Sequence, residues 1–289
     1  MMRLAGSDAV TEMYSNTGSA VSEEVLDAAR EELGLNRPFL VQYFSWLGEM
    51  LRGNMGVSYI SGRDVFATFV SKLPATLLLT VLSVLLTIVI SVPLGILAAV
   101  KQGRLADQVL RFLSFIGNAM PNFFVALLLM QLLSMKLGWL PVISDGTTIR
   151  SAIMPMLTLA IAMSAKYMRQ VRTAVLEELN KEYVNGAMAR GVSERVILWK
   201  SVMRSALLTI VTLLALSIGS LLGGTAIVES IFMWDGVGKL AVDAIQMRDY
   251  PLIQAYVVWM AIIYVVVNLI TDLLYRVLDP KIRLGAEKE

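Results

Sequence analysis

The sequence predicts an all-α protein that crosses a membrane several times. Of its 289 residues, 56% are hydrophobic, and the mean hydropathy is +0.67, which is typical of a polytopic membrane protein. Five apolar stretches follow one another after residue 73, and four of them exceed the roughly 20 residues that a helix needs to cross the bilayer core. The turn after the first stretch, the loop 166–204 and the tail are basic, whereas the loop 229–250 is acidic on balance, a difference that the positive-inside rule relates to the side of the membrane.

The composition excludes several kinds of chemistry within the chain. Cysteine and histidine are both absent, which removes disulfides, thiolate or imidazole metal sites, cysteine nucleophiles and Ser-His-Asp triads. We therefore expect no catalytic residue and no metal site. The net charge of +2 provides no broad basic field, so we expect no nucleic-acid partner.

Residues 1–73 precede the first apolar stretch and are polar enough to lie outside the membrane. Ser22–Leu33 predicts a short amphipathic helix, because acidic residues occupy its first turn and Gly34 follows it as a stop. Phe39–Leu51 is richer in aromatic residues. We expect these segments to form a small helical cap at the extracytoplasmic face of the membrane, without a chemical role.

Residues 74–284 form the predicted membrane domain. Its second span carries no charge and contains Pro121. Asn122 beside this proline could reach a pore, or it could cap the backbone carbonyls that the proline frees. The third span is short, and we expect it to continue as a helix past Arg169. The predicted spans are Ala75–Val100, Phe112–Met135, Ser151–Ala165, Ser205–Val228 and Pro251–Thr271.

The charges of the connections predict the side of the membrane on which each one lies. The turn after the first span and the loop 166–204 are basic, so we expect both in the cytoplasm. The loop 229–250 is acidic on balance and is expected outside, whereas the basic tail, ending with residues 285–289, returns to the cytoplasm. The charged residues considered are Lys101, Arg104, Asp107 and Arg111, then Lys166, Arg169, Arg172, Lys181, Arg190, Arg195, Lys200 and Arg204, then Glu229, Asp235, Lys239, Asp243, Arg248 and Asp249, and finally Arg276, Lys281 and Arg283.

The stretch Glu182–Leu208 has the pattern of two short helices lying on the cytoplasmic face. Apolar residues recur at helical spacing on both sides of Gly191, which interrupts the period, and Ser193 can serve as the N-cap of the second helix. Judged by charge alone, the same stretch is equally an ordinary basic inner loop.

The order of residues in this stretch resembles that of a known family. The coupling loop, or EAA loop, of ABC importer permeases is similar at Glu182, Ala187, Ala189 and Gly191. Further motifs, in the same order, resemble the first permease subunit of dipeptide, oligopeptide and nickel importers, and the resemblance covers about residues 31–284. The motifs are Leu33–Pro38, Gly53–Ser58, Ser91–Gly95, Ala119–Phe123, Gly138–Pro141, Gly223–Thr225, Ile231–Gly238, Arg248–Pro251 and Leu278–Arg283.

The resemblance implies a type I ABC importer transmembrane fold in the bacterial or archaeal plasma membrane. In that family a second homologous permease completes the pore, two ATPase subunits bind ATP and magnesium, and an extracytoplasmic binding protein delivers the substrate. No cofactor is expected in this chain, which would contact only these proteins and membrane lipid. The coupling loop, residues 182–204, would dock on an ATPase, and the residues implied for this coupling are Glu182, Ala187, Ala189, Arg190 and Gly191. The substrate stays open between a dipeptide, an oligopeptide and nickel, free or chelated.

Some features depart from the family pattern. Ser205 and Thr209 stand where the family often has asparagine and proline, so the joint between the coupling loop and the next span is not fixed by the motif. The family also has a membrane helix before a segment like Met2–Asp8. We therefore expect that this sequence begins at an internal methionine or lacks its first helix, so that five of six family spans are present; a true five-span protein is the alternative.

Two glycine-containing motifs have simpler explanations than a binding site. Gly219 and Gly223, together with Gly224, permit close approach of helices, either within the chain or at a permease–permease interface beside the pore. Gly236–Lys239 superficially resembles a phosphate-binding loop. It lacks the first glycine and the Ser/Thr magnesium ligand, and it follows no strand. ATP hydrolysis is therefore expected in partner subunits.

The alternatives from other functional classes are a stand-alone channel, a secondary transporter and an intramembrane enzyme. No charged residue is predicted in the middle of a span, whereas ion-coupled carriers generally need one. The spans contain no nucleophile–base pair and no paired carboxylates, and no filter-like sequence or charged ring. The sequence therefore favours a permease subunit over these alternatives.

Overall fold

The computed structural model describes residues 10–11, 14, 22–32, 34–144, 146 and 148–278, and it leaves the side chains of residues 208–209, 213–220, 222–224 and 274–278 undescribed. Within these ranges helices dominate, and the β-structure is one isolated antiparallel bridge between Val57 and Asp64. The all-α prediction is confirmed. The helices are α2 (Glu23–Glu32), α3 (Phe39–Leu51), α4 (Val65–Val100), α5 (Leu105–Ala119), α6 (Asn122–Leu129), η2 (Met130–Lys136), α7 (Ile149–Leu179), α8 (Glu182–Ala189), α9 (Glu194–Ile197), η3 (Leu198–Val202), α10 (Met203–Phe232), α11 (Val237–Gln246) and α12 (Tyr250–Leu278).

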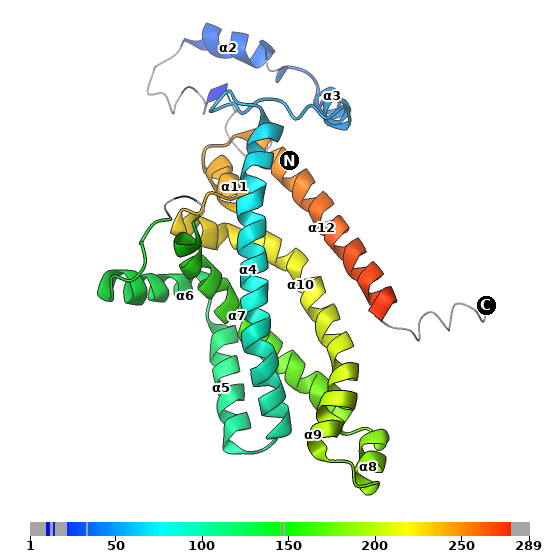
Figure 1. Cartoon of the computed structure of the whole chain (residues 1–289). Coiled ribbons are helices and arrows are strands. Elements are labelled where there is room, and N and C mark those ends of the chain that lie inside the picture. Colours follow the sequence, from blue (N-terminus) through cyan, green and yellow to red (C-terminus); the bar gives the residue numbers. More distant parts are fainter. Residues whose placement is uncertain are drawn as a thin grey trace, which may run out of the picture.

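α4 runs through the centre of the molecule and packs along α7 (Figure 1). A row of small polar residues on α4 faces the interior. The hydroxyls of Thr80, Ser83 and Thr87 donate to backbone carbonyls one turn earlier in the same helix, at 2.7–2.8 Å. These three hydroxyls therefore need no hydrogen-bond acceptor from another helix. Further along, a Cβ atom added to Gly95 would lie 2.7 Å from the Cβ of Val171. The small residues of α4 therefore allow α7 to approach closely.

The second predicted span is broken into two helical pieces. α5 and the segment formed by α6 and η2 are separated at Met120 and Pro121, and their axes differ by 101°. Met120 has an extended backbone, with φ −82° and ψ 125°, because the ring of a proline disfavours the α conformation in the residue before it. The broken pair therefore turns sharply within the part of the molecule that was predicted to cross the membrane.

Several described helices are long and apolar enough to cross a membrane. These are α4, α7 and the part of α12 from Tyr250 to Leu273, and the bent pair of α5 with α6–η2 can supply a fourth crossing. α10, with 30 residues, corresponds to the predicted span Ser205–Val228, but many side chains in its middle lie outside the described set. α7 extends past Arg169 as far as Leu179, as the sequence predicted.

The two connections predicted to be cytoplasmic lie at the same end of the molecule. Figure 1 shows the α4–α5 turn and the α8–α9 pair at its lower end, while α2, α3 and α11 lie at the upper end. This grouping agrees with the alternation of charges along the sequence. A core cluster near the lower end joins α4, α7, α8, α9 and α10; it includes Ile96, Tyr167, Val175, Val184 and Ile197.

The N-terminal segment forms the two predicted helices. Gly34, with φ +65°, follows α2 and takes a backbone conformation that favours glycine. α3 buries none of its residues, and Leu40 and Phe44 are each 64% exposed. An apolar helix with an uncovered face suits the expected position at the membrane interface.

Candidate functional site

The predicted coupling loop is a pair of short helices attached to the membrane helices by a few buried side chains. Val184 of α8 and Ile197 of α9 are each 3% exposed and belong to the core cluster at this end. The outer surface of the pair is left open. Of the predicted coupling residues, Ala187 is half-buried against the core, and those exposed to solvent are Glu182, Ala189, Arg190 and Gly191.

Gly191 forms the turn that ends α8. Its φ is +80°, a left-handed conformation that glycine adopts without strain. The amide of Gly191 donates to the carbonyl of Met188 at 2.9 Å, and the amide of Val192 donates to the carbonyl of Ala187 at 3.2 Å. These two bonds have the pattern of a Schellman motif, so the sequence prediction of a turn at Gly191 agrees with the geometry. Ser193 occupies the N-cap position of α9 as predicted, but its side chain makes no capping hydrogen bond.

The start of α8 is fixed by polar contacts with the end of α7. The Tyr183 hydroxyl donates to Glu178 Oε2 at 3.1 Å, and Lys181 Nζ lies 2.5 Å from Glu178 Oε1. Partial burial, followed by the hydrogen bond to the Glu178 carboxylate, raises the pKa of Tyr183 above its ordinary value. The raised pKa favours the protonated hydroxyl, which is the form that donates to Glu178.

The open surface of the pair is apolar as well as charged. Exposed apolar side chains lie beside the exposed predicted coupling residues on α8, α9 and η3. Such a patch on the outer face of two short helices is typical of a surface that another protein covers. Its members and their exposed fractions are Tyr183 41%, Met188 44%, Val192 37%, Val196 41% and Trp199 63%.

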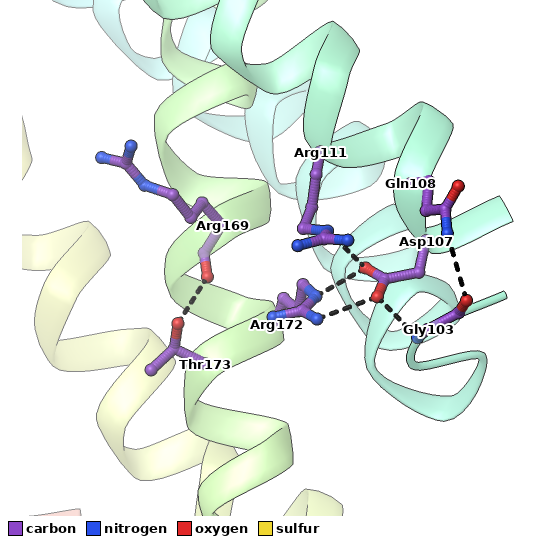
Figure 2. Close-up of polar contacts among 7 residues, drawn as sticks. All are labelled: Gly103, Asp107, Gln108, Arg111, Arg169, Arg172 and Thr173. Carbon is purple, nitrogen blue, oxygen red and sulfur yellow. Dashed lines mark hydrogen bonds and ion pairs between the residues drawn. The ribbon is translucent and has the colours of Figure 1, made fainter. Parts of the chain in front are cut away.

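A buried ionic cluster connects α7 to the start of α5 and to the α4–α5 turn (Figure 2). Asp107 is fully buried and accepts two hydrogen bonds from Arg172 of α7, with Nε–Oδ1 at 2.7 Å and Nη2–Oδ2 at 2.9 Å. The Gly103 amide donates to Oδ2 at 2.9 Å, and Arg111 Nε lies 3.4 Å from Oδ1. The carboxylate thus joins the α4–α5 turn to the helix that leads into α8. Charge counting along the sequence placed Asp107 in the turn after the first span and missed this pairing.

A second buried carboxylate lies at the opposite end. The sequence assigned Glu229 to an outer loop, but it belongs to α10 and is fully buried, so that assignment was wrong. Thr76 Oγ1 donates to Glu229 Oε1 at 2.8 Å, and the Lys239 amide donates to Oε2 at 3.0 Å. A Cβ atom on Gly236 would collide with Glu229 and Thr76, and one on Gly238 would lie 2.6 Å from the Cα of Ala226.

The loop that superficially resembled a phosphate-binding loop therefore holds a carboxylate of the chain itself. The first turn of α11 presents backbone amides to Glu229, the arrangement by which helix N-termini receive anions. Within the described residues, no group of three or more acidic side chains is placed to hold a metal ion.

Asn122 lies at the bend between α5 and α6, beside a cavity of about 230 Å³. In the described part of the chain its side chain makes no hydrogen bond, and it faces the cavity with Asn118 and Lys166. The predicted packing glycines Gly219, Gly223 and Gly224 lie in α10, among the positions outside the described set. The full lining of the cavity is Gly117, Asn118, Met120, Asn122, Leu159, Ala162, Met163, Lys166, Tyr167 and Leu221.

Comparison with known sequences finds one matching family and many similar proteins. The family described as "Binding-protein-dependent transport system inner membrane component" matches residues 91–284. Glutathione transport system permease protein GsiC of Salmonella choleraesuis is 36% identical, over 92% of this chain and 87% of that protein. Oligopeptide transport system permease protein AppB of Bacillus subtilis is 39% identical, over 98% of this chain and 92% of that protein.

Comparison with solved structures finds similar folds at low sequence identity. A chain of the MetNI methionine ABC transporter, solved in inward-facing conformations, matches with a TM-score of 0.61 and 17% identity, over 73% of this chain and 96% of that one. A chain of an amino acid ABC transporter crystallised with histidines matches with a TM-score of 0.59 and 18% identity, over 73% and 94% of the two chains. At these identities the likeness shows the fold alone.

Proposed function

Because this chain belongs to the family of binding-protein-dependent transport system inner membrane components, we propose that it forms one half of the pore of a peptide importer of the ABC class. The resemblance to ABC importer permeases predicted from the sequence is confirmed by the family match and by the two similar permeases. The family and the apolar helices also identify it as a multi-pass protein of the plasma membrane. The finer parts of the proposal concern its partners, its coupling surface and its substrate.

The single observation that carries the coupling proposal is the exposed α8–α9 pair. Two short helices stand at the end of the molecule predicted to be cytoplasmic, attached through Val184 and Ile197 and apolar on their open side. A docked ATPase subunit would cover Met188 and Trp199, and Glu182 and Arg190 would lie at the edge of that contact. ATP-driven movement of the ATPase would then reach the membrane helices through α7 and α10, which flank the pair in the sequence.

ATP hydrolysis itself belongs to the proposed partners. The Glu229 carboxylate packs against Gly236–Lys239 and accepts a hydrogen bond from the Lys239 amide. This contact supports a structural role for the segment rather than nucleotide binding. The proposed assembly contains this chain, a second homologous permease, two ATPase subunits and an extracytoplasmic binding protein. Its alternating access to the two sides of the membrane would be driven by differential contacts with the ATPases in their open and closed states.

We propose a small peptide as the substrate. The names of the two similar permeases specify glutathione and oligopeptide transport, and both classes of molecule carry amide bonds and free carboxylates. The sequence also left nickel, free or chelated, open as the substrate. The uptake experiment below distinguishes nickel from a peptide.

Uptake by cells that lack this chain tests the proposal. Deleting the chain is expected to reduce the energy-dependent uptake of radiolabelled trialanine to background, and a plasmid copy is expected to restore it. Uptake of a free amino acid by a separate carrier serves as the control. Unchanged trialanine uptake would reject the peptide proposal, and a loss of radioactive nickel uptake instead would assign the importer to the metal.

A further inference from the structure

Lys166 lies on α7 at its contact with the middle of α5. The Ser114 hydroxyl donates a hydrogen bond to the backbone carbonyl of Ala165, and a Cβ atom added to Gly117 would lie 2.8 Å from the Cβ of Ala165. These two contacts place residues 165–166 of α7 level with Ser114–Asn118 of α5. Lys166 therefore lies far from the α4–α5 turn, although charge counting assigned it to a cytoplasmic loop.

The depth of Lys166 follows from the lengths of the two helices. Gly117 is about 18 Å along α5 from Leu105, and Lys166 is about 9 Å along α7 from Arg172, at the rise of an α-helix. The neighbouring surface of α5 is apolar, with Phe112 64% and Phe115 71% exposed. An ammonium group at this depth is costly unless it faces a polar path or a partner, and intramembrane charges generally mark such paths.

Within the described residues, the Lys166 amine has no carboxylate partner. Its nearest aromatic neighbour is the ring of Tyr167, whose centroid lies 5.9 Å from Nζ, and a cation–π contact of this length is weak. Asp107, a buried carboxylate on the neighbouring helix α5, is occupied by Arg172 and Arg111. The side chain of Lys166 is exposed in the single chain. The amine is therefore available to an anion from outside the chain.

The side chains around the amine are suited to a peptide. Asn118 and Asn122 line the same cavity of about 230 Å³ as Lys166. Each asparagine offers an amide donor and a carbonyl acceptor. Tyr167 also lines the cavity, and its buried hydroxyl has no hydrogen-bond partner among the described residues. One cationic group with neutral donors and acceptors around it matches a carboxylate attached to amide groups, as at the C-terminus of a peptide.

We propose that Lys166, with Asn118 and Asn122, forms a temporary binding station for the carboxylate of the peptide as it passes through the permease. The proposal rests on the proposed function and specifies where the substrate touches this chain. Arg169, also exposed and one turn nearer the cytoplasm, continues the positive charge in the direction of import. An ammonium group without a permanent counterion attracts the carboxylate, and the absence of a bidentate clamp lets it leave.

The lack of cysteine in this chain allows a direct test of charge at this position. The complex carrying the Lys166→Cys variant would be purified through a tag on this chain, treated with a methanethiosulfonate reagent and reconstituted in liposomes with its binding protein. ATP-driven accumulation of radiolabelled trialanine and the ATPase rate are then measured. An aminoethyl reagent restores a positive charge at residue 166, whereas a sulfonatoethyl reagent adds a negative one.

We expect the unmodified variant to transport trialanine roughly tenfold more slowly than the wild type, as follows from the loss of one charged hydrogen-bond partner, while the ATPase rate and the assembly of the complex persist. Aminoethylation is expected to restore transport, and sulfonatoethylation is expected not to. The matched control is Lys136→Cys, because Lys136 is also exposed but ends η2, away from the cavity. Transport by this control, and by the wild-type complex, is expected to be insensitive to both reagents.

Several results would overturn the proposal. These are wild-type transport by the unmodified variant, resistance of residue 166 to labelling, and a loss of transport that aminoethylation does not repair. Loss of the second permease from the purified complex would show instead that Lys166 pairs with a carboxylate of that partner. If the wild-type complex itself accumulates no trialanine, the proposed function fails before the variant is compared, so the two failures are distinguishable.

Discussion

Asp107 and Glu229 are charged residues in the interior of a protein whose composition is mostly apolar. Each is fully buried, and each is held by groups from a different part of the chain: Asp107 by the Arg172 guanidinium, and Glu229 by a threonine hydroxyl and a backbone amide. A buried carboxylate is tolerated when its oxygens accept such hydrogen bonds. The two residues therefore fix how helices pack at the two ends of the molecule.

Removing the charge of Asp107 is expected to destabilise the protein. The Asp107→Asn variant would leave Arg172, only 18% exposed, without its counterion, and breaking a buried pair in this way typically costs about 3–5 kcal/mol. We expect a clear fall in the apparent melting temperature of the purified protein in detergent, with insertion into the membrane retained.

Arg111 provides the matched control for this variant, because it contacts the same carboxylate but is 53% exposed. Arg111→Gln is expected to change the stability by no more than about 1 kcal/mol, as for other exposed pairs. The double variant Asp107→Asn with Arg172→Gln should lose less stability than the sum of the single variants. Equal melting temperatures for Asp107→Asn and the wild type would show that the cluster does not hold α5 to α7.

At the scale of the element, α7 connects the membrane part to the proposed coupling surface. It runs without a break from Ile149 to Leu179, packs on Gly95 of α4 and is clamped to the α4–α5 turn through Arg172. α8 begins three residues after its end. A rigid helix fixed at several points along its length is suited to transmitting a displacement of α8 to the cavity near Lys166.

Substitutions in α8 and in the α8–α9 turn are expected to impair transport and binding of the ATPase. Gly191→Leu places a branched side chain at φ +80°, where L-residues are disfavoured by about 1–2 kcal/mol, and Glu182→Lys reverses an exposed charge on the proposed docking face. We expect both variants to insert normally but to lose trialanine transport and co-purifying ATPase. Quantitative immunoblotting of the tagged complex measures the retained ATPase.

Two substitutions at the opposite end of the molecule serve as controls for these variants. Gly48→Leu lies in α3, where a Cβ atom meets no atom within 4 Å and φ is not positive, and Glu24→Lys lies on the exposed surface of α2. Both are expected to retain the ATPase. If Gly191→Leu and Glu182→Lys retained it as well, at wild-type transport rates, the coupling assignment would be wrong.

At the scale of the whole molecule, the surface of this chain is that expected of one subunit of a larger complex. Its helices leave apolar surfaces open on α5 and α6 as well as on the α8–α9 pair; Phe123 of α6, for example, is 49% exposed. Lipid covers some of this surface in the membrane, and the proposed second permease and ATPases would cover the rest.

Purification from native membranes in a mild detergent is expected to recover the chain as part of a complex. Mass spectrometry should identify a second permease and ATPase subunits in the complex, and a binding protein that associates more weakly. An unrelated tagged membrane protein of similar abundance controls for nonspecific association. Recovery of the chain alone, under conditions that preserve other membrane complexes, would favour a stand-alone channel or an enzyme.

The sequence alone determined the all-α membrane class, the family resemblance and the helix–turn–helix pattern around Gly191. These features depend on local periodicity, residue type and motif order, which need no knowledge of distant contacts. The position of the break after Met120 was also visible locally as Pro121, but its angle of 101° depends on the packing of α5 and α6 against α7.

Only the tertiary structure decided the surroundings of the charged residues. Asp107 meets a partner 65 positions away in Arg172, and Glu229 meets one 153 positions away in Thr76, separations that no local pattern encodes. The charges around Lys166 assigned it to a loop. The sequence does not show which residues of α5 and α7 contact each other, and these contacts place Lys166 beside the middle of α5. The energy of a charge depends on its immediate dielectric surroundings and counterions, and in this protein the packing of separate helices supplies both.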